Sequence, residues 1–138
     1  MDEGNQALCR QLDTVDTALG FLLLIVLSVL VSYTATARQR QALCLAIQGD
    51  TDRAAELGDV YPLRLGSSAL VVGSLGYFFM LALKTCRNAD PDDPVARHSA
   101  WMNVIAAFLV LLAALIRLFD LNFVRRAQPA LAGELLPD

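Results

Sequence analysis

TALGFLLLIVLSVLVSYTAT, residues 17–36, is a run of 20 residues without a charged side chain. A hydrocarbon core of roughly 30 Å is crossed by about 20 helical residues. The run does not alternate apolar and polar residues, as a strand of a membrane β-barrel would. Because only helices and closed barrels satisfy their backbone groups in lipid, the run predicts a transmembrane helix.

Two further stretches without charge follow, Leu65–Leu83 and Ala100–Ile116, and every charged side chain of the chain lies outside the three. Hydrophobic residues make up 56% of the 138 residues, above the share that is typical of soluble chains. A chain this short cannot hide so much apolar surface in a water-surrounded core, because small domains keep much of their surface exposed. We therefore predict an all-α membrane protein, a three-transmembrane-helix bundle forming a single integral membrane domain over residues 1–138, with spans at 17–36, 64–84 and 100–123.

A cleavable signal peptide is the alternative explanation of the first stretch, and residues 35–37 (Ala-Thr-Ala) fit a small-x-small cleavage site. The residues before the stretch argue against it. They carry Asp2, Glu3, Asp13 and Asp16 against Arg10 alone, whereas a signal peptide begins with net positive charge. We favour a retained helix.

The connections are short. Between Gly20 and Gly49 no glycine or proline interrupts the chain, so we expect an extended first helix that continues to about Gln48. The first loop, 37–63, is expected to be partly helical, with a short helix over 51–57. The second loop, 85–99, holds a turn rich in aspartate and proline, after which Pro94 opens the third helix. Pro129 is expected to end that helix.

The arginines and the lysine orient the chain, because they are enriched in cytoplasmic loops. With three spans, the N-terminal segment and the second loop share one side, and the first loop and the C-terminal segment share the other. The first side holds four basic residues and the second holds six, which favours an N-terminus outside and a cytoplasmic C-terminus. The four are Arg10, Lys84, Arg87 and Arg97, and the six are Arg38, Arg40, Arg53, Arg64, Arg125 and Arg126.

The same arrangement of three spans places Cys9 and Cys86 on one side of the membrane and Cys44 on the other. A disulfide between Cys9 and Cys86 is therefore compatible with an outside location of that side. The alternative is three free thiols. The spacing of the cysteines matches no metal-binding motif.

Small residues line one quarter of the second predicted helix: Gly66, Ala69, Gly73 and Gly76. Helices in lipid associate by close packing across small residues, because lipid provides no hydrophobic drive between them. This face predicts a packing surface for a second copy or another membrane protein. Packing on the chain's own helices is the alternative, and it is the more common use of such a face.

The other two predicted helices show similar faces, which we expect to point into the bundle. On the first helix the face consists of Thr17, Gly20, Ser28 and Ala35. On the third helix it consists of Asn103, Ala106, Ala107, Val110, Ala113, Ala114, Arg117 and Asp120.

Arg117 and Asp120 are three residues apart, close enough on a helix to form an ion pair. Ionisable residues inside a membrane indicate a functional site. The alternative is an interfacial position, because Arg117 lies roughly 25 Å along the helix from Trp101, which resembles an interfacial anchor.

Chemistry-bearing motifs are sparse. The chain has one histidine and shows no phosphate-binding loop, zinc ligand set or nucleophile–base pattern. We expect no catalysis, no cofactor and no metal, and the net charge of -3 gives no indication of nucleic-acid binding. The expected partners are the lipid bilayer and either further copies of the chain or another membrane protein.

Three functions remain open. The sequence favours a small non-enzymatic membrane protein that acts through helix–helix contacts, as an accessory subunit or a small homo-oligomer. A pore-forming, holin-like protein is the first alternative. A non-catalytic subunit of a membrane enzyme or transporter is the second.

Overall fold

The computed structural model describes residues 2–135, and these form four helices: α1 (Asp2–Ile47), α2 (Thr51–Gly58), α3 (Tyr61–Arg87) and α4 (Pro94–Leu135). The described residues contain no strand. Three helical stretches, Asp2–Ile47, Thr51–Arg87 and Pro94–Ala127, are long and apolar enough to cross a membrane. The prediction of a helical bundle with three such helices is thus confirmed.

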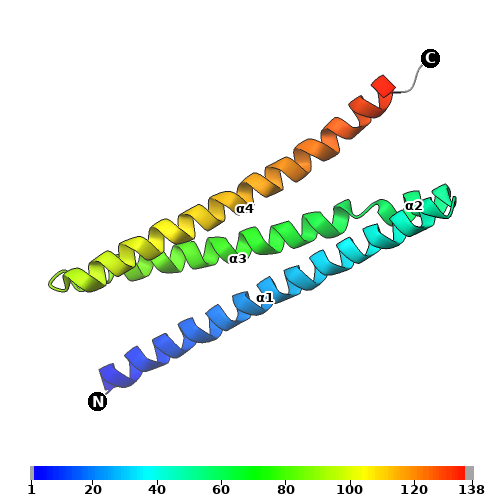
Figure 1. Ribbon diagram of the computed structural model, residues 1–138. Coiled ribbons are helices and arrows are strands. Elements are labelled where there is room, and N and C mark those ends of the chain that lie inside the picture. Colours follow the sequence, from blue (N-terminus) through cyan, green and yellow to red (C-terminus); the bar gives the residue numbers. More distant parts are fainter. Residues whose placement is uncertain (1, 136–138) are drawn as a thin grey trace.

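The three long helices form one open layer with α3 in the middle (Figure 1). Helix α3 packs against α1 on one side and α4 on the other, and α2 folds back onto α1. Over the described residues α1 and α4 do not pack against each other. The layer therefore leaves most of its apolar surface uncovered: only 6% of the most apolar window of α1, and of α4, is buried.

The boundaries of the helices follow from local sequence. Gly49 has a φ of 89°, the left-handed conformation that favours glycine, and it ends α1 close to the predicted position. The Asp50 carboxylate accepts a hydrogen bond from the backbone N–H of Arg53 and caps α2, the predicted short helix. At the second turn, Asp93 Oδ1 accepts hydrogen bonds from the N–H groups of Val95 and Ala96 as Pro94 opens α4.

The prediction that Pro129 ends the third helix is wrong, because α4 continues to Leu135. A proline removes one backbone hydrogen bond, but the residues around this one, Gln128, Ala130, Leu131 and Ala132, are good helix formers. At the other end of the chain α1 begins at Asp2, so the polar N-terminal residues extend the helix of the first span.

The contact between α1 and α3 follows a seven-residue repeat. The buried residues of α1 are Ser28, Ala35 and Ala42, the last of which lies against Gly58 of α2. The buried residues of α3 are Ser67 and Ser74, seven residues apart, and Ala82. A seven-residue repeat keeps a seam facing its partner when two helices supercoil gently. Of the face predicted on the first helix, Ser28 and Ala35 lie in this seam, whereas Thr17 and Gly20 are exposed.

The prediction that the small and polar face of the third helix points into the bundle is largely wrong. Ala107 and Ala114 are partly buried, but the other six residues are exposed: Asn103, Ala106, Val110, Ala113, Arg117 and Asp120. The reason is that, within the part of the chain that the structure describes, α4 packs on α3 and on no other helix, through a seam that includes Ala100 and Val104. No third helix covers the small and polar face beside that seam.

Candidate functional site

The small-residue face of α3 lies on the uncovered side of the layer. Gly66, Ala69 and Gly73 are exposed, and Gly76 is partly exposed. A Cβ atom built on Gly66, Gly73 or Gly76 would meet no atom within 4 Å. Neither α1 nor α4 therefore makes use of these glycines, and the face, which we call the α3 outer face, is open to another helix.

Serines instead form the close contact between α1 and α3. The Ser67 hydroxyl donates to the backbone carbonyl of Ser28 at 2.8 Å and lies 3.3 Å from the Ser32 hydroxyl. Further along the same two helices, the rings of Phe21 and Tyr77 stack with centroids 4.1 Å apart. The sequence prediction missed this role of Ser67, although the seven-residue spacing of Ser67 and Ser74 was a usable signal.

A groove of about 520 Å³ opens between α1, α3 and α4, on the side where α1 and α4 fail to meet. Its polar lining is Ser32, Ser67, Ser68 and Arg117, and its apolar lining includes Val71, Leu75 and Leu109. We call it the serine–arginine groove. It gathers residues from three helices that the sequence alone did not bring together.

The structure does not bring Arg117 and Asp120 together. Both side chains are exposed. Over residues 2–127, for which side chains are described, the ion pairs are Arg53–Asp50 and Arg125–Asp59, and neither involves Arg117. Arg117 lines the serine–arginine groove, as does Ser68, which is one turn, or about 6 Å, further along α3 than Arg64.

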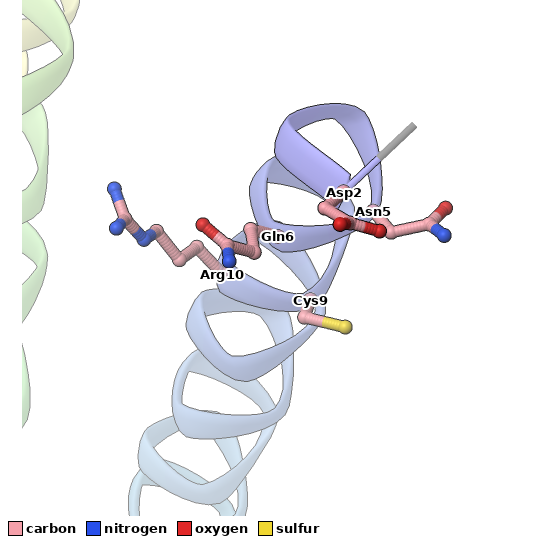
Figure 2. Close-up of a pocket in the computed structure, with 5 residues that line it drawn as sticks. All are labelled: Asp2, Asn5, Gln6, Cys9 and Arg10. Carbon is pink, nitrogen blue, oxygen red and sulfur yellow. The ribbon is translucent and has the colours of Figure 1, made fainter.

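The cysteines Cys9, Cys44 and Cys86 are free thiols, so the structure does not bring Cys9 and Cys86 into a disulfide. Cys9 is exposed near the start of α1, and its side chain points to a different side of that helix from Gln6 and Arg10 (Figure 2). The five residues labelled there line a hollow and all belong to the first turns of α1, which makes the hollow a surface feature of one helix.

A polar cluster ties the start of α3 to α4. Arg125 forms an ion pair with Asp59 at 3.1 Å, and its guanidinium carbon lies 4.7 Å from the centre of the Tyr61 ring. The Tyr61 hydroxyl donates to Asn122 Oδ1 at 2.8 Å. This cluster closes one end of the α3–α4 contact, and it leaves the serine–arginine groove open beside it.

No group of three or more histidine, cysteine or acidic side chains in the described part of the chain could hold a metal ion. In comparisons with known proteins, the chain matches no family model, no curated protein and no solved structure. The α3 outer face and the serine–arginine groove are the two candidate functional surfaces of the described residues.

Proposed function

We propose that this chain is a non-enzymatic, multi-pass membrane protein that acts through helix–helix contacts, as an accessory subunit or a small homo-oligomer. Helices α1, α3 and α4 span the bilayer in this proposal, with the N-terminus outside and the C-terminus cytoplasmic. The three long apolar helices support the location, and the excess of basic residues in the first loop and after the third span supports the orientation.

The exposure of the α3 outer face carries the proposal. Each glycine in the interior of a helix lowers the stability of that helix by about 1 kcal/mol relative to alanine. The packing of a single chain does not offset this cost, because no atom approaches the Cβ positions of Gly66 and Gly73. A second helix that approaches across these glycines would offset it through close van der Waals contact, which is the main source of helix association in lipid.

We expect Gly73→Ile to weaken association by about tenfold or more, equivalent to about 1.4 kcal/mol. The branched side chain would hold a partner helix away from the α3 backbone. The measurement is the monomer–oligomer equilibrium of the full chain in lipid bilayers at varying protein density, or capture of a partner from native membranes.

Gly20→Ile is the matched control. Gly20 is also an exposed glycine within an apolar helix, and a Cβ there likewise meets no atom within 4 Å. It lies on α1, away from the α3 outer face, so its substitution should leave association unchanged. Association that survives Gly73→Ile in a correctly folded protein would contradict the proposal.

The serine–arginine groove is the one observation that favours the pore-forming alternative, since a pore needs polar side chains facing one path. Its polar residues Ser32, Ser67, Ser68 and Arg117 gather near one end of the apolar segments, and Leu75 and Leu109 continue the lining. Conductance across protein-containing liposomes that disappears in Arg117→Leu would favour the pore over the accessory role.

A further inference from the structure

We propose that the serine–arginine groove binds an anionic glycerophospholipid, with the phosphate at Arg117 and Ser68 and an acyl chain along Val71, Leu75 and Leu109. This inference rests on the membrane location in the proposed function, but it does not rest on self-association. The groove lies beside the α1–α3 seam, whereas the helix-contact proposal concerns the α3 outer face.

The charge of the groove selects an anion. Among the described side chains that line the groove, Arg117 is the only charged one, and none of them is a carboxylate. Neither ion pair found over residues 2–127 involves this arginine. An unpaired guanidinium below the membrane surface is costly, and a phosphate offsets that cost because it accepts two parallel hydrogen bonds from arginine.

The shape of the groove fits a lipid. About 520 Å³ is within the range of small-molecule sites, and the lining changes from hydroxyls and arginine at one end to aliphatic side chains. This polarity gradient follows that of a phospholipid from its phosphate to its acyl chain. Because α1 and α4 do not meet, the groove is open sideways, and a lipid can enter it from the bilayer.

The position of the groove agrees with a lipid of the cytoplasmic leaflet. The phosphate-binding end lies about one helical turn from Arg64, one of the six basic residues on the proposed cytoplasmic side. Anionic lipids are abundant in that leaflet, and basic pockets between spanning helices on that side bind their headgroups. A second copy of the chain could replace the lipid only if it brought a hydrogen-bond acceptor to the Arg117 guanidinium.

The test is native mass spectrometry of the purified full chain in micelles, with phosphatidylglycerol and phosphatidylcholine of identical acyl chains. We expect phosphatidylglycerol to bind about tenfold more tightly than phosphatidylcholine. Arg117→Gln should abolish this preference, and Arg126→Gln should retain it, since Arg126 is an exposed arginine of α4 outside the groove. Equal binding of both lipids, or a preference that survives Arg117→Gln, would overturn the inference.

A second pair of variants tests the acyl-chain half of the site without a change of charge. Ala113→Phe fills the groove, and it should weaken binding of both lipids by about tenfold. Ala106→Phe places the same ring on an exposed alanine of α4 that does not line the groove, and it should change neither affinity. Equal lipid binding by the two variants, with matching helical content, would also overturn the inference.

The outcomes separate this inference from the proposed function. Gly73→Ile should keep the lipid preference while it loses association, because the α3 outer face does not line the groove. A chain that never associates but still prefers phosphatidylglycerol through Arg117 would refute the helix-contact proposal and leave the lipid site standing. Loss of the preference in Gly73→Ile, with its helical content intact, would show that the lipid binds elsewhere.

Discussion

In intact membranes, Leu23→Cys is expected to resist a water-soluble maleimide, whereas Leu43→Cys is expected to react at least about tenfold faster. The two leucines lie on the same helix, and their exposed fractions in the folded chain are nearly equal, 69% and 66%. Protein packing alone therefore predicts equal reaction rates. In a bilayer the two reaction rates are expected to differ. Residue 23 lies well inside the first apolar segment, whereas residue 43 lies five residues beyond Arg38 and outside that segment.

The physical reason is the ionisation of the thiol. Maleimide reacts with the thiolate, and hydrocarbon that excludes water strongly disfavours a charged group. The experiment needs a background in which Cys9, Cys44 and Cys86 are replaced by serine, with reagent admitted to both sides of the membrane. Labelling in denaturant provides the reference for complete reaction. Similar rates at the two positions in intact membranes would refute the spanning arrangement and, with it, both proposals.

Ala35→Phe is expected to destabilise the packing of α1 against α3 by about 1–3 kcal/mol or more. Ala35 is fully buried, and the small side chains of this seam allow the two helices to approach closely. A phenyl ring in that position would push the helices apart and would weaken the Ser67–Ser28 hydrogen bond. The measurement is the free energy of unfolding by titration with sodium dodecyl sulfate in mixed micelles.

Thr34→Phe is the control, because it places the same ring one residue earlier on an exposed side of α1. Its own local hydrogen bond, from the Thr34 hydroxyl to the Leu30 carbonyl, lies within one helix. We expect a much smaller change there, since the ring can extend into lipid or detergent. Equal stability of the two variants would mean that the seam through Ala35 does not hold α1 against α3.

Features that depend on neighbouring residues were predictable. A run such as residues 17–36 indicates a helix of membrane-spanning length, because its apolar character and its lack of breakers act over adjacent turns. Pro94 likewise opened α4 as expected, through its fixed φ, and the Asp93 carboxylate caps the first turn. Pro129 shows the limit of such rules, since the surrounding helix formers carry α4 past it.

The choice of packing faces was not predictable in the same way. In a helix that faces lipid on one side and protein on the other, both sides are apolar, so the pattern of hydrophobicity does not separate them. Small residues identify faces that allow close approach, but they do not say which helix approaches. The face of Gly66 and Gly73 and that of Ser67 and Ser74 were both available on α3, and the contact with α1 uses the serines.

The sequence alone determines the number of long helices, their approximate bounds and the turns between them. It does so because runs without charge, capping residues and prolines act within a few residues. Only the tertiary structure decides that α3 is central, that its glycines stay uncovered, and that Arg117 lines a groove with Ser68 and forms no ion pair with Asp120. Those features depend on where helices distant in sequence come into contact. That choice is made by the fit of side chains across an interface, and no single helix carries the information.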